Sequence, residues 1–135
     1  TDPTNDVDGW DAAIKVAALV TVLMDTPFTP QMVHPTGIRG ITAEMIEQAK
    51  AEGKRWKLVA SAKRDGDQIV ASVAPELVSP SSPLYGMMDS STGLSFETDV
   101  LPFYSITVSE SPDMRGGPEE TAYGLFADFV NIARR

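Results

Sequence analysis

The chain has 135 residues, of which 42% are apolar and none is cysteine. This composition predicts a folded domain with a hydrophobic core, and it excludes a disulfide framework and a thiolate metal site. The net charge of −8 argues against binding to nucleic acids or anionic membranes, because both attract basic surfaces. The longest apolar run, residues 16–24, is shorter than the roughly 20 residues of a membrane span. The absence of cysteine fits a reducing cytoplasm, so we expect a cytoplasmic protein.

The first strong pattern is a helix over residues 10–24. Residues 1–9 are polar and rich in turn formers, which predicts a loop or a short lead-in to that helix. Residues 10–24 are apolar on almost every side, so the helix is expected to be buried on most sides. Asp8 is a candidate cap and Asp11 a candidate first-turn residue. Pro27 is expected to end the element, because proline interrupts a helix.

The later elements follow from caps and turns. Residues 42–52 predict a second helix with Thr42 as its cap, and Gly53 is suited to end it. Residues 55–63 and 68–74 alternate as strands do, and the intervening Arg-Asp-Gly-Asp predicts a hairpin turn. Two further strands and a last helix are expected at residues 94–99, 104–110 and 118–134.

This order of elements predicts an α+β fold for one domain, residues 1–135. Strands that follow one another closely predict a mostly antiparallel or mixed sheet, with the helices covering one face in a two-layer sandwich. The first predicted strand has apolar residues on both faces, Leu58 and Val59 among them. The second face therefore needs a cover of its own, and a partner subunit is one candidate.

Asp11 and Lys15 are the charged residues of the first predicted helix. They are four positions apart, so they share one face of it. Two charges on a buried helix are costly unless they pair or meet a polar ligand. One interpretation is a salt bridge at the solvent edge. The other is a pair that lines a polar pocket, where Lys15 donates or accepts a proton, and the spacing alone leaves both open.

Residues 2–15, DPTNDVDGWDAAIK, resemble the signature of homoserine dehydrogenases, roughly Asp-Pro-x-x-Asp-hydrophobic-x-Gly-x-Asp-x-Ala-x-Lys. The identical positions are Asp2, Pro3, Asp6, Gly9, Asp11, Ala13 and Lys15. The resemblance is greatest to the short form of the enzyme, in which an aromatic residue often follows the glycine. Weaker similarity continues along the chain, for example at residues 37–38 and 49–53.

The resemblance implies an oxidoreductase that interconverts L-homoserine and L-aspartate 4-semialdehyde with NAD or NADP. That reaction belongs to threonine, methionine and isoleucine biosynthesis. The resemblance also implies that Lys15 and Asp11 are catalytic, and that Asp6 and Asp11 bind the substrate. This is chemically sensible, because an alkoxide is stabilised by a cationic proton donor and an ammonium group by carboxylates. The family uses this domain to form dimers, so we expect a homodimer.

Gly116 and Gly117 precede the last predicted helix, where the family has a small-residue loop near the nicotinamide. The resemblance makes both glycines candidate cofactor-binding residues, and a plain turn before a helix is the alternative. The loop, MRGGPEET, is more charged than the family's version. The chain contains no G-x-G-x-x-G fingerprint and begins with Thr1. We therefore expect part of a longer enzyme, without its nucleotide-binding domain and inactive alone.

Two other hypotheses stay open. One is a non-catalytic amino-acid-binding α+β module that dimerises through its sheet. The other is a diverged homologue that acts on another small 2-amino acid. A dinucleotide fingerprint encoded upstream of Thr1 would favour the enzyme. The single histidine, His34, gives no basis for a triad, and we expect no metal site.

Overall fold

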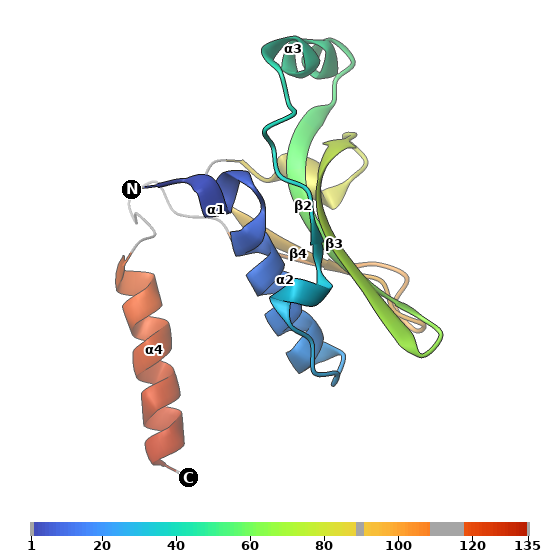
Figure 1. Ribbon diagram of the computed structural model, residues 1–135. Coiled ribbons are helices and arrows are strands. Elements are labelled where there is room, and N and C mark those ends of the chain that lie inside the picture. Colours follow the sequence, from blue (N-terminus) through green and yellow to red (C-terminus); the bar gives the residue numbers. More distant parts are fainter. Residues whose placement is uncertain (1, 89–90, 109–117, 135) are drawn as a thin grey trace. The chain divides into compact units, whose positions relative to one another are not determined.

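The computed structural model describes residues 2–88, 91–108 and 118–134, and the chain divides into two compact units, Thr1–Tyr85 and Gly86–Arg135. The first unit contains α1 (Thr4–Val7), α2 (Trp10–Leu23), η1 (Pro30–Met32), β1 (His34–Pro35), α3 (Ala43–Ala51), β2 (Arg55–Asp65) and β3 (Gln68–Val78) (Figure 1). A short 3-10 helix, η2 (Pro83–Gly86), spans the division. The second unit contains β4 (Thr92–Phe96), β5 (Tyr104–Val108) and α4 (Pro118–Ala133). The expected α+β fold is confirmed, and the assignment of residues 1–135 to one domain stays a prediction.

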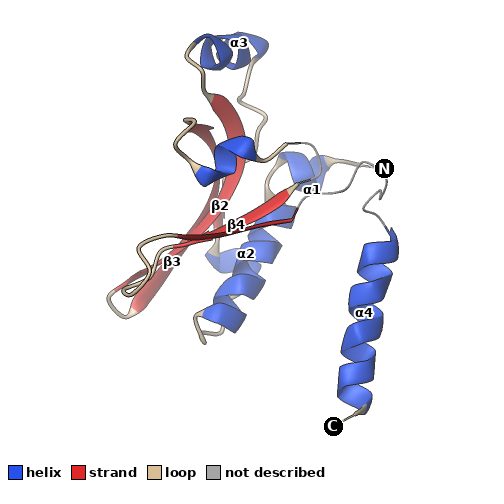
Figure 2. Ribbon diagram, turned by 180° about the vertical axis from the view of Figure 1, so that it is seen from behind, coloured by secondary structure: helices blue, strands red, loops and turns tan. Residues whose placement is uncertain are grey.

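In the first unit, α2 packs on a three-stranded sheet with the order β1-β3-β2 (Figure 2). Strands β2 and β3 are antiparallel, and β1 is parallel to β3, which makes the sheet mixed. The helix buries residues spaced as one helical face, against β3 residues whose side chains point to one side of the sheet. The buried residues are Ala13, Val16, Ala17 and Val20 on α2, and Ala71 and Val73 on β3. In this unit a helix, α2, covers one face of a sheet, as predicted.

Helix α2 buries more residues than α1 or α3, but the prediction that it is buried on most sides is wrong. The side facing away from the sheet leaves Ile14 56% exposed and Val22 77% exposed. The sequence pattern shows which side chains of the helix are apolar, but it does not show which of them another part of the protein covers. One small sheet covers only one face of an almost wholly apolar helix.

Several predicted element ends are confirmed by the hydrogen bonds that form them. The Thr42 hydroxyl accepts a hydrogen bond from the Met45 N–H (3.3 Å) and so caps α3. Asp65 pairs with Gln68, so the hairpin turn consists of two residues, and Gly66 has a left-handed φ of +59°. Asp8 does not cap α2, because the N-cap is Gly9 and no side chain makes a capping hydrogen bond, whereas Asp11 lies in the first turn as predicted.

In the second unit, β4 and β5 form an antiparallel pair, and α4 begins at the predicted Pro118. The strands begin and end close to the predicted residues, and the facing Ser95 and Ser105 hydroxyls are 2.8 Å apart. None of the helices in the described ranges is long and apolar enough to cross a membrane.

Candidate functional site

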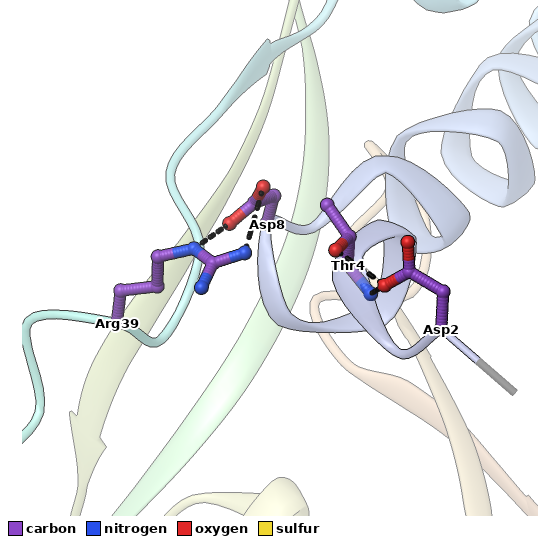
Figure 3. A network of polar contacts seen from close by, with 4 residues as sticks. All are labelled: Asp2, Thr4, Asp8 and Arg39. Carbon is purple, nitrogen blue, oxygen red and sulfur yellow. Dashed lines mark hydrogen bonds and ion pairs between the residues drawn. The ribbon is translucent and has the colours of Figure 1, made fainter.

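The residues of the N-terminal signature form α1, α2 and the turn between them. Asp2 lies before α1, and its carboxylate accepts hydrogen bonds from the Thr4 N–H (2.9 Å) and the Thr4 hydroxyl (2.5 Å) (Figure 3). These bonds hold the pKa of Asp2 below its usual value, because they favour the charged form. Asp2 therefore stabilises the start of a helix too short to form by itself.

Two glycines allow the end of α1 to lie close to other backbone. Gly9 has a φ of +83°, which suits glycine, and a Cβ there would lie 3.2 Å from Val73 Cγ1. A Cβ on Gly37 would lie 2.1 Å from the Val7 carbonyl oxygen, closer than atoms can approach. The next residue, Ile38, donates its N–H to that same oxygen (2.8 Å). Gly37 and Ile38, in the segment after β1, therefore pack directly against the turn between α1 and α2.

An ion pair between Arg39 and Asp8 also holds the turn between α1 and α2 in place. The Arg39 guanidinium donates through Nε to Asp8 Oδ1 and through Nη2 to Asp8 Oδ2, the second at 3.3 Å (Figure 3). The contact raises the pKa of Arg39, chiefly through the hydrogen bond. Sequence reasoning missed Arg39, because the two residues lie 31 positions apart and no periodicity links them. Their opposite charges are the only signal in the sequence.

Asp11 and Lys15 form the expected pair on α2. Lys15 Nζ lies 2.7 Å from Asp11 Oδ2, and the two side chains are 72% and 47% exposed. The described residues therefore place this pair at the surface and not in a closed pocket. Exposed pairs at this spacing stabilise a helix by only about 0.3–0.5 kcal/mol, so stability alone gives a weak reason for it.

Asp6 lies on α1 and is exposed, and its backbone carbonyl accepts the Gly9 N–H (3.2 Å). The three predicted site residues of the signature thus lie on two consecutive helices joined by two residues, Asp8 and Gly9. Gly116 and Gly117, the candidate cofactor-binding residues, lie outside the described residues. Within the described part of the chain, no three potential metal ligands form a group.

A small hollow of about 180 Å³ lies between α3 and the strands, away from the signature. Its lining consists of Met45, Gln48, Ala49, Glu52, Trp56 and Leu77. It is smaller than the roughly 300–1,000 Å³ of typical small-molecule sites, and its lining lacks a basic residue for phosphates. This hollow therefore does not fit a nicotinamide dinucleotide.

Comparison with known proteins assigns the family. The model of the homoserine dehydrogenase family matches residues 1–130 of the chain. The chain belongs to this family. The NAD(+)-dependent homoserine dehydrogenase of Pseudomonas canavaninivorans is 37% identical over 132 residues, which are 97% of this chain and 36% of that protein. Homoserine dehydrogenase of Corynebacterium glutamicum is 33% identical, over 98% of this chain and 30% of that protein.

Solved homoserine dehydrogenases share the fold. The enzyme from Thiobacillus denitrificans superposes with a TM-score of 0.85 at 26% identity, covering 99% of this chain and 30% of that one. The Staphylococcus aureus enzyme gives a TM-score of 0.84 at 26% identity, covering 98% of this chain and 32% of that one. The resemblance seen in the signature is confirmed along almost the whole chain. The chain spans about a third of the length of these relatives.

Proposed function

We propose that this chain is the substrate-binding and catalytic domain of a homoserine dehydrogenase that interconverts L-homoserine and L-aspartate 4-semialdehyde. The observation that supports it best is the Asp11–Lys15 ion pair, at 2.7 Å, on a helix otherwise made of uncharged residues. Membership of the family supports the reaction class. The cofactor, NAD or NADP, is proposed to be bound mainly by another domain, because this sequence contains no G-x-G-x-x-G fingerprint.

The proposed role of this chain is at the polar groups of the substrate. Reducing an aldehyde to an alcohol places negative charge on its oxygen, and the Lys15 ammonium donates a proton to that oxygen. Asp11 orients the Lys15 ammonium through their ion pair. Asp6 and Asp11 bind the substrate ammonium, which fixes the distance between the reacting carbon and Lys15.

The exposure of the pair requires a covering surface. The Lys15 side chain is 72% exposed, so water solvates its ammonium group and weakens the interaction of that group with a developing alkoxide. The chain spans only about a third of its relatives, so the remainder of such an enzyme is available to close the site. Gly116 and Gly117 are proposed to contact the nicotinamide. The same proposal places the protein in the cytoplasm and in threonine and methionine biosynthesis.

If another domain binds the cofactor and this chain binds the substrate, the chain alone should lack dehydrogenase activity. Hydride transfer needs a bound nicotinamide, and this sequence contains no dinucleotide-binding fingerprint. NAD(P)H oxidation with aspartate semialdehyde should therefore stay at the background rate with the purified chain. The complete enzyme, with its nucleotide-binding domain, should oxidise NAD(P)H in the same assay. Turnover by the chain alone would contradict the proposal.

We also propose a homodimer formed through the sheet. Among the described strands, β2 lies at an edge of the sheet. Val70 of β3 points to the face opposite α2 and is 54% exposed. We expect sedimentation at micromolar concentration to give a dimer. Val70→Lys should weaken it, and Gln31→Lys, at an exposed position outside the sheet, should not. A monomer at high micromolar concentration would contradict this prediction.

A further inference from the structure

We propose that Arg39 is a positioning residue for this site, acting through its two-point contact with Asp8. The contact fixes the orientation of α1 relative to α2. Asp6 lies on α1, whereas Asp11 and Lys15 lie on α2, so the mutual placement of the three groups depends on this angle. The inference rests on the proposed function, because it assumes that these groups bind one substrate.

Helix α1 needs such an attachment. It consists of four residues, Thr4–Val7, and none of them is buried. A helix this short is not stable by itself, and without buried side chains the core does not hold it in place. Gly9, with its φ of +83°, follows directly and lacks the side chain that would restrict the backbone. The orientation of α1 is therefore set by contacts at its C-terminal end.

The segment after β1 supplies these contacts. The backbone hydrogen bond from the Ile38 N–H to the Val7 carbonyl (2.8 Å) sets the distance between this segment and the end of α1. A single hydrogen bond leaves rotation about its axis open. The Arg39 guanidinium adds two donors to the two oxygens of one carboxylate, which fixes direction as well as distance. Asp8 is the C-cap of α1, so this restraint acts at the junction itself.

The pair is better suited to positioning than to stability. The side chains of Arg39 and Asp8 are 63% and 33% exposed, and surface ion pairs contribute little to the free energy of unfolding. Loss of the pair should therefore appear in substrate binding while the protein stays folded. A merely structural pair would give the opposite result, a lower melting temperature with unchanged kinetics.

The test measures homoserine oxidation and thermal melting of the complete enzyme. Arg39→Gln should raise KM for homoserine and lower kcat/KM by about 10- to 100-fold, because a misplacement of about 1 Å can cost about 100-fold. KM for the nucleotide should stay unchanged, and the melting temperature should fall by less than about 5 °C. Arg39→Lys keeps the charge without the planar fork, so it should recover the activity only in part.

A double-mutant cycle separates the contact from the two residues. If the pair acts as a unit, Asp8→Asn, Arg39→Gln and the double variant should share one kcat/KM. Arg64→Gln is the matched control. It removes the same charge and a hydrogen bond to the Met24 carbonyl (2.9 Å), but Arg64 lies on β2, near the hairpin turn. Its kcat/KM should equal that of the wild type.

Lys15→Ala, measured in the same assay, distinguishes two kinds of failure. If Lys15→Ala is defective while Arg39→Gln stays within two-fold of wild type, the positioning role is overturned and the proposed function stands. If Lys15→Ala also has normal kinetics, both are overturned. Additive losses in Asp8→Asn and Arg39→Gln would likewise overturn the role of their contact.

Discussion

Replacing Lys15 with Ala in the complete enzyme is expected to lower kcat for homoserine oxidation by about 10²–10⁴-fold, the usual contribution of a positioned acid–base group. The physical reason is that the substrate oxygen loses its cationic partner during hydride transfer. Steady-state oxidation of homoserine at saturating nucleotide measures the loss. Asp11→Asn should also lower kcat, because it removes the carboxylate 2.7 Å from the ammonium.

The salt-bridge interpretation makes a different prediction for the same variant. If the pair only stabilises α2, Lys15→Ala costs about 0.3–0.5 kcal/mol and leaves kcat near wild type. Lys50→Ala is a matched control, since Lys50 forms a similar exposed pair with Glu47 on α3, also at 2.7 Å. Its kcat should not change. Near-normal kcat in folded Lys15→Ala protein would show that Lys15 is not catalytic.

Asp6→Asn is expected to raise KM for homoserine more than it lowers kcat. The reason is that Asp6 is proposed to contact the substrate ammonium and not the reacting carbon. A contact made equally in the ground state and the transition state affects KM more than kcat. The ratio of the two effects therefore distinguishes Asp6 from Lys15 within one set of measurements.

The elements predicted most accurately have signals within a few residues of one another. The helix at α2, the Thr42 cap and the Gly66 turn each depend on local spacing or on one conformational preference. The missed elements are those too short for periodicity. Helix α1 has four residues and β1 has two, and β1 forms because it pairs in parallel with residues 72–73 of β3.

The ion pair of the candidate site could be predicted from the sequence, but its exposure to solvent could not. The spacing of Asp11 and Lys15 puts them on one face of a helix, so their ion pair follows from helix geometry. Their exposure does not follow, because an apolar helix is buried only where another surface meets it. The contact of Arg39 with Asp8 depends on the path of the chain after β1, which no local rule describes.

The second large effect is expected at Gly37. In Gly37→Ala the new Cβ would lie 2.1 Å from the Val7 carbonyl oxygen and 2.5 Å from Asp8 Cα. Both atoms belong to the backbone, so no side chain can rotate away and the segment must separate from α1. This separation breaks the hydrogen bond from Ile38 to Val7. We expect a loss of about 2–4 kcal/mol in the free energy of unfolding.

Urea denaturation followed by tryptophan fluorescence measures this loss, since both tryptophans, Trp10 and Trp56, belong to the first unit. The matched control is Gly40→Ala, three residues further along the same segment. A Cβ at Gly40 would have nothing within 4 Å, so that variant should change stability by less than about 0.5 kcal/mol. In the complete enzyme, Gly37→Ala should also lower kcat/KM for homoserine, because Asp6 moves with α1. Equal stability of the two alanine variants would show that the segment is not pressed against α1.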